Sequence, residues 1–558
     1  MVSDTASRPL ALWSWANKQA KESRLLIWLA LLALSSLFAM QVLRGSVLYE
    51  GWVQDIFIHL NGILNIQSGN LPHTGFSTPV GPFYYLAHYL TTYFAPPSAF
   101  TAVYANGFVA ALAALFSLLV GYRRLHPGWT AILILYVGIV AISPRQLGHL
   151  FLTFNATYNR WSWAFFAVLA ILVSIPPADA ERPRAAVQDG ALTGVLLGLL
   201  FFTKVTYAAV GLGLVLVSLG TVRRSAHPLL YILATVMTAG LLVLLVELRF
   251  GIVFPYFADL HRAAQVPGVN RIQQLIMIAY VTTSDQVAIF LVAAIAAAAS
   301  GARLRLSNVV YLLVLVLAGL AIATQNHIAP EIPLTPAVAL VAYRLFHGPE
   351  ANPRVPLALR LAASIAVAGL FARALALDTI TIVEESLAPA APGSDVDWLR
   401  DTPLHALAFK ASNTQVVVDG KCTAQPWIYG LGREYFAIVQ DGVRLLKEHR
   451  SGDGRVLSLT WSNPFPLILG GQPPRHDLSW WDSGRTFTST VHPPARELFR
   501  DVKYVMIPRY QGSNHGSNPP TADLMLSIYG SEIERNYKLL GESGCWRLMG
   551  RIEPAERP

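Results

Sequence analysis

The strongest constraint on how this chain folds is a series of long apolar segments that fills most of its first 378 residues. A helix needs about 20 mostly apolar residues to cross a hydrocarbon core about 30 Å thick. On that basis we expect about eleven transmembrane helices, at residues 24–43, 99–121, 129–143, 161–176, 187–203, 205–221, 227–247, 284–300, 307–323, 331–346 and 357–377. The segments 187–203 and 205–221 fit either two short helices or one broken helix.

The charge content separates this chain from soluble proteins. Only 13% of its residues are charged, whereas soluble domains carry roughly 25%. Residues 1–378 contain 23 basic residues (Lys and Arg) and 13 acidic residues (Asp and Glu). Residues 379–558 contain 19 basic and 20 acidic residues. We therefore expect a polytopic α-helical membrane part over 1–378 and a soluble domain over 379–558. Ordinary cytosolic enzymes and secreted modules are excluded.

The excess of Lys and Arg over Asp and Glu in residues 1–378 indicates how the chain is oriented in the membrane rather than binding to nucleic acid. Every second loop carries basic residues, which are Arg123-Arg124, Arg182 with Arg184, Arg223-Arg224, Arg303 with Arg305, and Arg344 with Arg354. Short loops rich in Lys and Arg stay on the cytoplasmic side of a membrane. We therefore expect a multi-pass protein of the cytoplasmic (inner) membrane, with a cytoplasmic N-terminus and an extracytoplasmic, periplasmic C-terminal domain.

The C-terminal domain is predicted to be a compact α/β domain. Short β-like runs at 415–418, 456–459 and 504–507 are separated by helical stretches and by many Pro, Gly and Trp residues. Both cysteines of the chain, Cys422 and Cys545, lie in this domain. An oxidising compartment allows them to form a disulfide, and the alternative is two unrelated buried thiols. Two cysteines provide no metal signature.

The segment 44–98 between the first two predicted spans is the first outside loop, and it contains the densest group of polar side chains. Its aromatic and polar residues fit helices that lie along the membrane interface. A true span at 83–97 is rejected because it would reverse the alternation of basic loops. Asp55 and His59 share one helix face at i, i+4 spacing. Asp55 can act as a general base, or alternatively cap a helix or pair with an arginine.

Several short motifs resemble those of the C-type (GT-C) glycosyltransferases. The matching residues are Asp55 soon after the first span, Gly69 to His73 (Gly-x-Leu-Pro-His), Pro79 to Tyr85 (Pro-x-Gly-Pro-x-Tyr-Tyr), the Gly-rich stretch Gly194 to Lys204, and Gln325 to His327. This superfamily of polytopic enzymes includes protein O-mannosyltransferases and the aminoarabinose and galacturonic acid transferases of lipid A. The resemblance implies a polyprenyl-phosphate sugar donor and a catalytic role for Asp55.

One departure from that pattern concerns metal binding. Many members of the superfamily have a second acidic residue in the next outside loop, whereas Ser143 to Arg160 contains no carboxylate. A divalent metal prefers several oxygen ligands, usually including carboxylates. A metal is therefore compatible with the sequence but not supported by it, and no other cofactor is implied. Tyr158, Asn159 and Arg160 in this loop fit sugar or phosphate contacts, or alternatively an aromatic anchor at the interface.

Basic side chains on the outside face are expected to hold the lipid phosphate, since Arg and Lys are the usual phosphate ligands. Lys204 is the best candidate because it lies in a turn between two spans, followed by Arg160 and His327. His59, His73, Tyr84, Tyr158 and Asn159 complete the predicted substrate-binding set. The long outside loop 248–283, with Arg262 and Arg271, is expected either to cover the site or to be a solvated loop at the headgroups.

These observations predict a sugar transferase at the outer face of the cytoplasmic membrane. The expected partners are a polyprenyl-phosphate sugar donor, a lipid, glycan or protein acceptor, and membrane lipids, with no nucleic acid. Trp461, Trp480 and Trp481 either shape the acceptor side or only pack the domain. The alternatives are a transporter or lipid flippase, for which no internal repeat is apparent, and a scaffold or receptor, which leaves Asp55 and its neighbours unexplained. No Walker motif supports an ATP-driven pump.

Overall fold

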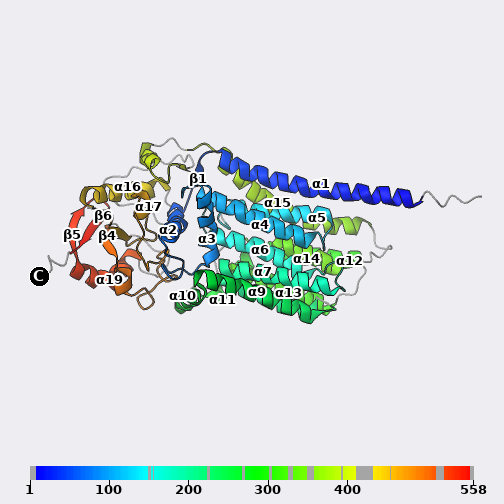
Figure 1. Cartoon of the computed structure of the whole chain (residues 1–558). Coiled ribbons are helices and arrows are strands. Elements are labelled where there is room, and N and C mark those ends of the chain that lie inside the picture. Colours follow the sequence, from blue (N-terminus) through cyan, green and yellow to red (C-terminus); the bar gives the residue numbers. More distant parts are fainter. Residues whose placement is uncertain are drawn as a thin grey trace, which may run out of the picture.

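The computed structural model consists of a long helical bundle and a mixed domain of strands and helices at one end of it (Figure 1). The residues that it describes are 8–148, 152–154, 156–222, 226–266, 270–300, 305–324, 331–347, 357–390, 394–409, 432–450, 452, 454–509 and 521–552.

The helices of the bundle coincide with the predicted apolar segments. They are α1 (Arg8–Leu43), α4 (Thr101–Gly121), α5 (Pro127–Ile142), α6 (Thr157–Ser174), α7 (Pro183–Thr203), α8 (Val205–Thr221), α9 (Pro228–Phe250), α12 (Thr283–Ser300), α13 (Leu306–Ala323), α14 (Thr335–His347) and α15 (Leu357–Leu387). Six helices of the described chain are long and apolar enough to cross a membrane, or seven if α12 and the bent helix before it form one span. A multi-pass helical protein is therefore confirmed, whereas the number of spans and their orientation stay predictions.

The structure resolves the alternative for segments 187–203 and 205–221. Lys204 has an extended backbone, with φ −159° and ψ 111°, so α7 ends before it and a separate helix α8 begins after it. An extended residue interrupts the helical hydrogen-bond ladder because its neighbours can no longer bond four residues apart. The two helices therefore meet at a break at Lys204, whose side chain is half-buried.

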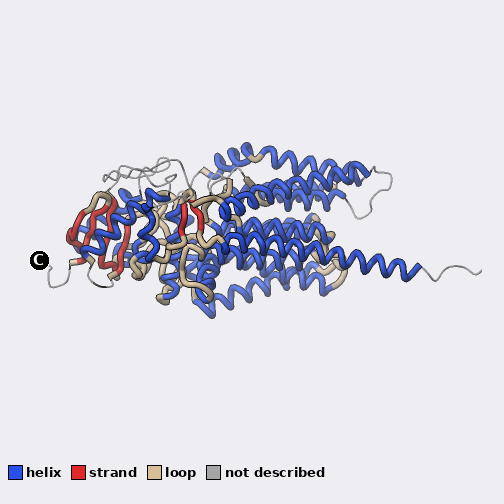
Figure 2. The backbone as a smooth tube through the Cα atoms, turned by 90° about the horizontal axis from the view of Figure 1, so that it is seen from above, coloured by secondary structure: helices blue, strands red, loops and turns tan. Residues whose placement is uncertain are grey.

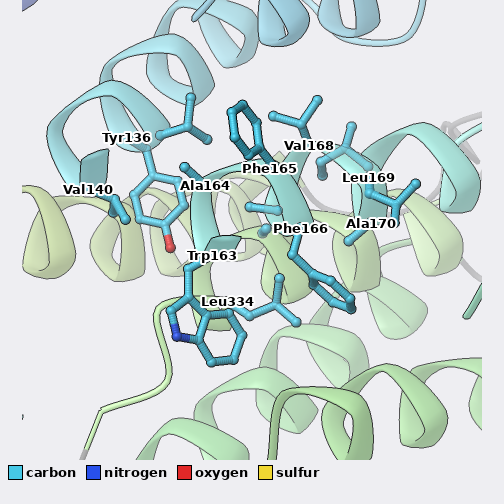
Figure 3. Close-up of a cluster of buried hydrophobic side chains, with 14 of the residues drawn as sticks. Tyr136, Val140, Trp163, Ala164, Phe165, Phe166, Val168, Leu169, Ala170 and Leu334 are labelled. Atoms are coloured by element: carbon cyan, nitrogen blue, oxygen red, sulfur yellow. The ribbon is translucent and has the colours of Figure 1, made fainter. Parts of the chain in front are cut away.

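Helix α6 forms the centre of the bundle core. All of its residues except Tyr158 are buried, as expected of a helix that is apolar on every side. Figure 3 shows Phe165, Phe166 and Val168 of this helix in one cluster with Tyr136 of α5 and Leu334, which lies just before α14. This packing holds the first turn of α6, which carries Tyr158 and Asn159, at a defined place.

The first outside loop folds as short elements between the bundle and the C-terminal domain (Figure 1). These are β1 (Val47–Tyr49), the 3-10 helix η1 (Val53–Asp55), α2 (Ile56–Gln67), α3 (Pro82–Leu90) and η2 (Thr91–Tyr93). Helix α3 has nine residues, which is far fewer than the roughly 20 that a span requires. The prediction that residues 83–97 do not span the membrane therefore agrees with the length of α3. The second outside region forms α10 (Val253–Gln265) and α11 (Arg271–Val281).

The C-terminal domain contains a four-stranded sheet in the order β3-β4-β6-β5, in which β3 and β4 are parallel and the other pairs antiparallel. Its elements are η3 (Ser394–Asp401), β2 (Leu407–Phe409), α16 (Gly432–His449), β3 (Arg455–Ser458), α17 (Phe465–Ile468), α18 (Ala495–Leu498), β4 (Val502–Pro508), α19 (Thr521–Asn536), β5 (Tyr537–Glu542) and β6 (Trp546–Arg551). The predicted runs 456–459 and 504–507 lie on β3 and β4, whereas run 415–418 lies outside the described residues.

The predicted disulfide between Cys422 and Cys545 stays a prediction. Cys545 is buried just before β6, and Cys422 lies outside the described residues.

The first outside loop and the C-terminal domain are joined into one structural unit. Strand β1 pairs in parallel with β2, with Val47 opposite Leu407, and the strands are drawn in red in Figure 2. The two regions also share one apolar core, to which Phe57 and Leu60 of α2 and Phe436 and Trp546 of the domain belong. Helix α15 continues through the predicted boundary at 378/379 and ends at Leu387. Side chains of the loop and of the domain can therefore form one rigid site.

Candidate active site

Asp55 is held at the contact between the first outside loop and the C-terminal domain. The indole Nε1 of Trp461 donates a hydrogen bond to Asp55 Oδ1 at 2.9 Å. The hydroxyl of Ser462 donates to the carbonyl oxygen of Gln54 at 2.7 Å, which fixes the backbone on the other side of the carboxylate. Asp55 lies at the N-terminus of α2, yet its side chain makes no capping hydrogen bond. The helix-cap alternative for this residue is therefore not realised.

The environment of Asp55 suits a base that works near neutral pH. Its side chain is buried, and burial raises the pKa of Asp55 to about 7. The hydrogen bond from Trp461 and the charge of Arg485 oppose this rise, whereas the nearby Asp482 carboxylate adds to it. A carboxylate with such a pKa accepts a proton from a hydroxyl more readily than an exposed one does.

Lys204 lies at the break between α7 and α8 in an aromatic surrounding. Its Nζ donates to Asn159 Oδ1 at 2.9 Å and lies 5.4 Å from the ring centroid of Tyr158 and 5.9 Å from that of Tyr207. Burial lowers the pKa of Lys204 to about 7, and the positive charges of Arg485 and Arg271 lower it further. A partly desolvated ammonium of this kind gains stability when an anion binds beside it.

Tyr84 and Tyr158 connect the Lys204 position with the first outside loop. Their rings meet edge to face, with centroids 5.3 Å apart, and Lys204 lies over the ring of Tyr158. The charge of Asp55 contributes to raising the pKa of Tyr84, after the larger effect of burial. Four predicted substrate-binding residues are thus brought together, which are Tyr84, Tyr158, Asn159 and Lys204.

The glycine of the Pro-x-Gly-Pro motif determines how closely the first outside loop approaches this break. The amide of Gly81 donates to the carbonyl oxygen of Thr203 at 3.0 Å. A Cβ atom at position 81 would clash with the carbonyl group of Phe202. Only glycine allows this approach of two backbones, which places α3 and Tyr84 beside Lys204.

The Gly81→Ala substitution is therefore expected to destabilise the protein by about 1–3 kcal/mol, because an added methyl group forces the two backbones apart. Thermal unfolding of the purified protein measures this effect. Gly213→Ala in α8 is the matched control, because a Cβ atom at that position meets no neighbour within 4 Å. Equal unfolding temperatures for the two variants would contradict the proposed packing role of Gly81.

His59 lies one helical turn after Asp55 but in a different surrounding. Its ring stacks on that of His88 at a centroid distance of 4.5 Å. Burial lowers the pKa of His59 well below its usual value, and the neighbouring His88 adds to this, so the ring is neutral. Neither ring nitrogen has a hydrogen-bond partner among the described residues. His59 is therefore a buried neutral ring that packs against His88, one helical turn after Asp55.

His73 connects the first outside loop with α10. Its Nδ1 lies 2.9 Å from Asp259 Oδ2, which also accepts a hydrogen bond from the Thr78 amide at 3.0 Å. Arg262 Nη1 donates to Ser77 Oγ at 3.0 Å. Helix α10 thus packs against the loop that carries the first two motifs.

Arg160 is engaged in a buried network of the bundle. Its guanidinium donates to the carbonyl oxygens of Arg145 and Val140 and to Asp378 Oδ1, at 2.6, 3.0 and 2.9 Å. Asp378 also accepts from Arg145 Nε at 3.0 Å. These contacts assign Arg160 a structural role in joining α6 to α15, and its predicted phosphate contact is untested. His327 lies outside the described residues.

The sequence left open whether Trp461, Trp480 and Trp481 shape the acceptor side or only pack the domain, and it did not indicate that this domain acts on Asp55. Trp461, Asp482 and Arg485 all influence Asp55, although they lie more than 400 positions later in the chain. Within the described residues, no group of three or more His, Cys, Asp or Glu side chains is arranged to hold a metal ion.

The fold and the site together define an apolar helical bundle with a buried carboxylate, Asp55, and a half-buried lysine, Lys204, near its junction with an α/β domain. No family model matches the sequence, and no curated protein matches it. Among solved structures, the chain is similar to ArnT from Cupriavidus metallidurans bound to undecaprenyl phosphate. The identity is 12% and the TM-score 0.46, with 98% of this chain and 99% of that chain covered.

Two further structures are similar to this chain. The apo state of the same ArnT has 13% identity and a TM-score of 0.48, with 95% of this chain and 99% of that chain covered. The third structure is the archaeal oligosaccharyltransferase AglB from Archaeoglobus fulgidus in complex with an inhibitory peptide and a dolichol-phosphate. Its identity is 13% and its TM-score 0.35, with 95% of this chain and 75% of that chain covered.

Proposed function

We propose that this protein transfers a sugar from a polyprenyl-phosphate-linked donor to a lipid, glycan or protein acceptor at the outer face of the cytoplasmic membrane. One observation carries the proposal. Asp55, a buried carboxylate with a raised pKa, lies where the first outside loop meets the C-terminal domain, and the half-buried ammonium of Lys204 lies over the ring of Tyr158, which meets the ring of Tyr84 edge to face. The motifs that resemble those of the C-type glycosyltransferases include both residues, which supports the same assignment.

The chemistry follows from the charges of these two groups. Asp55 accepts the proton of the acceptor hydroxyl, whose oxygen then forms a bond to the anomeric carbon of the donor sugar. The bond from that carbon to the phosphate oxygen breaks, and its electron pair leaves with the polyprenyl phosphate. Lys204 stabilises the negative charge that develops on this leaving group. A single displacement of this kind inverts the anomeric configuration.

The rate of transfer is expected to show a bell-shaped dependence on pH with its maximum near neutrality. Asp55 must be ionised, so kcat/KM rises as the pH rises through its pKa of about 7. Lys204 must be protonated, so kcat/KM falls as the pH rises through its pKa of about 7. Initial rates between about pH 5 and pH 9 with one donor and one acceptor measure this profile. A rate that is constant over this interval would contradict both assignments.

The experiment that tests the function is a transfer assay with the full chain in liposomes. A panel of labelled polyprenyl-phosphate sugars is offered with lipid, glycan and peptide acceptors, and both the glycosylated product and the free polyprenyl phosphate are measured. The expected result is equal amounts of the two products and an inverted anomeric centre. Retention of configuration would contradict the single displacement. Movement of an unmodified lipid or solute across the bilayer, without donor consumption, would favour a transporter or flippase instead.

A further inference from the structure

A groove lies on the side of the helical bundle between α12 and α13. Helix α12 packs on α14 and α15, and α13 packs on α8 and α14, so α14 is the neighbour that they share. The space between them is a cavity of about 460 Å³. Its lining is apolar and mostly small, and it includes Ala293, Ala294, Ala297 and Ala298 of α12 and Val309 and Leu312 of α13. The methyl side chains of α12 leave a space that larger side chains would fill.

The groove is closed toward the bundle and open toward its surroundings. Leu312 and Phe346 of α14 line its floor and are buried, whereas Ala294 and Ala298 are exposed. The outward side of α12 is also apolar, since Leu291 is 56% exposed, and α13 is one of the helices that are long and apolar enough to cross a membrane. Water is absent from the bilayer core. A groove in this position is therefore filled by hydrocarbon.

The size of the groove fits a hydrocarbon chain rather than another helix. Its lining on α12 runs from Phe290 to Ala298, which is about 12 Å along a helix that rises about 1.5 Å per residue. The volume of about 460 Å³ over that length gives a mean cross-section of about 40 Å². A helix with side chains is about 10–12 Å wide and has about twice that cross-section. Extended chains, whose carbon atoms pack about 4 Å apart, have room in the groove.

A basic side chain lies at one end of the groove. Arg305 immediately precedes α13 and is exposed. The amide of Val309 donates to its carbonyl oxygen at 3.3 Å, so the two residues lie one helical turn apart on the same face. Asn308 Nδ2 donates to the carbonyl oxygen of Leu345 at 3.1 Å, which joins this turn of α13 to the end of α14. A chain that lies against Val309 and Leu312 therefore has its head group at the level of Arg305.

This end of the groove is far from the candidate active site. The exposed Arg344 of α14 donates through Nη2 to the carbonyl oxygen of Arg124 at 3.3 Å. Arg124 follows α4, which begins beside the first outside loop at Thr101 and ends at Gly121. The groove therefore lies in the part of the bundle away from the C-terminal domain (Figure 1). Several arginines gather at this end, and basic residues next to a membrane attract anionic head groups.

We propose that the groove between α12 and α13 binds an acyl chain of an anionic phospholipid, whose head group is held by Arg305. The lipid fills the space between the two helices and thereby stabilises their arrangement on α14. This site is separate from the proposed phosphate position at Lys204, which lies beside the first outside loop. It is also independent of the proposed sugar transfer, since it requires neither donor nor acceptor.

Binding of phosphatidylglycerol to the delipidated full chain in detergent, compared with phosphatidylcholine of the same acyl chains, tests the inference. Native mass spectrometry measures the bound lipid. The wild type is expected to bind phosphatidylglycerol more tightly. Arg305→Gln is expected to reduce this preference by roughly fivefold, the usual effect of one basic residue at anionic head groups, and to leave phosphatidylcholine binding unchanged. Arg305→Lys is expected to keep the preference.

Ala294→Leu tests the groove itself, because a larger side chain at this exposed lining position occupies the space of the acyl chain. It is expected to weaken the binding of both lipids, by about fourfold for each methylene group that no longer finds room. The matched controls are Arg182→Gln, at an exposed arginine that likewise immediately precedes a helix, α7, and Ala362→Leu, at an exposed alanine of α15. Both controls are expected to bind lipid as the wild type does.

Three results would overturn the inference. The first is equal affinity of the wild type for the two lipids, and the second is wild-type binding of both lipids by Ala294→Leu. The third is a different occupant of the groove. A dimer of the wild type that Ala294→Leu abolishes would identify a second copy of the chain, and displacement of phosphatidylglycerol by an equimolar isoprenyl phosphate would identify the donor. Because no sugar transfer is measured, failure of this inference is distinguishable from failure of the proposed function.

Discussion

Replacing Asp55 with asparagine is expected to reduce sugar transfer by roughly 10²–10⁴-fold, which is the usual contribution of a general base. Asparagine has nearly the same shape, and its carboxamide oxygen can still accept the hydrogen bond from Trp461. It cannot take up the proton of the acceptor hydroxyl at neutral pH. The loss is therefore expected in kcat rather than in the affinity for the donor. Rates of polyprenyl phosphate release by wild type and variant, at saturating donor and acceptor, measure the effect.

Stability measurements separate this chemical loss from a folding defect. Because burial raises the pKa of Asp55, its contribution to stability is complete below the unfolded pKa of about 4 and is lost as the pH rises through about 7. Asp55→Asn removes the cost of burying the charge, so the variant is expected to unfold at the same or a higher temperature than the wild type at pH 8. Lower transfer together with a lower unfolding temperature would point to misfolding.

The matched control for Asp55 is Asp477 in the C-terminal domain. Its Oδ1 also accepts a hydrogen bond from a tryptophan, Trp481, at 2.9 Å, and burial raises its pKa to about 7. Asp477→Asn therefore makes the same chemical change at a second buried carboxylate, whose tryptophan partner is Trp481 rather than Trp461. It is expected to retain most of the transfer activity. If both variants lose activity equally, or if Asp55→Asn transfers sugar as fast as the wild type, Asp55 is not the base.

Lys204→Gln is expected to reduce transfer by roughly 10²–10³-fold, as observed when one group that stabilises developing negative charge is removed. Glutamine can keep a hydrogen bond to Asn159 but carries no charge for the leaving phosphate. Both kcat and the affinity for the polyprenyl phosphate product are expected to fall, whereas the affinity for the acceptor is unchanged. Single-turnover release of labelled polyprenyl phosphate and product inhibition measure the two effects separately.

The control for Lys204 is Lys503→Gln on strand β4. Lys503 Nζ also lies over a tyrosine ring, 5.8 Å from the centroid of Tyr504, but on the sheet of the C-terminal domain. This variant is expected to transfer sugar at the wild-type rate. Because burial lowers the pKa of Lys204, the folded protein loses stability as the pH falls through about 7. Lys204→Gln is therefore expected to be at least as stable as the wild type at pH 6. Unchanged product inhibition in this variant would remove Lys204 from the phosphate site.

The helical part of the fold was predictable because apolar segments of this length have few alternatives. A segment that crosses lipid must satisfy its backbone hydrogen bonds internally, which only a helix does within one segment. The break at Lys204 was one of two alternatives that the sequence left open, and a span at 83–97 was rejected because it would reverse the alternation of basic loops. Strands β3 and β4 were marked by short apolar runs.

Part of the candidate site was predictable for the same local reason. Asp55, Tyr84, Tyr158 and Lys204 stand out because ionisable and polar groups are costly near an apolar bundle. Arg160 stood out equally, but its partner Asp378 lies 218 positions away in α15. A sequence shows that a buried charge needs a partner, and it does not show whether that partner is the protein or a substrate.

The sequence alone determines that this protein is a helical bundle with a polar first outside loop and a separate α/β region, because hydropathy and charge act over short stretches of chain. Only the tertiary structure brings Trp461 to Asp55, through the pairing of β1 with β2 and the shared apolar core. Such contacts depend on how two surfaces pack, and no local pattern encodes that packing. The raised pKa of Asp55 is likewise a property of the folded chain, since burial is its main cause.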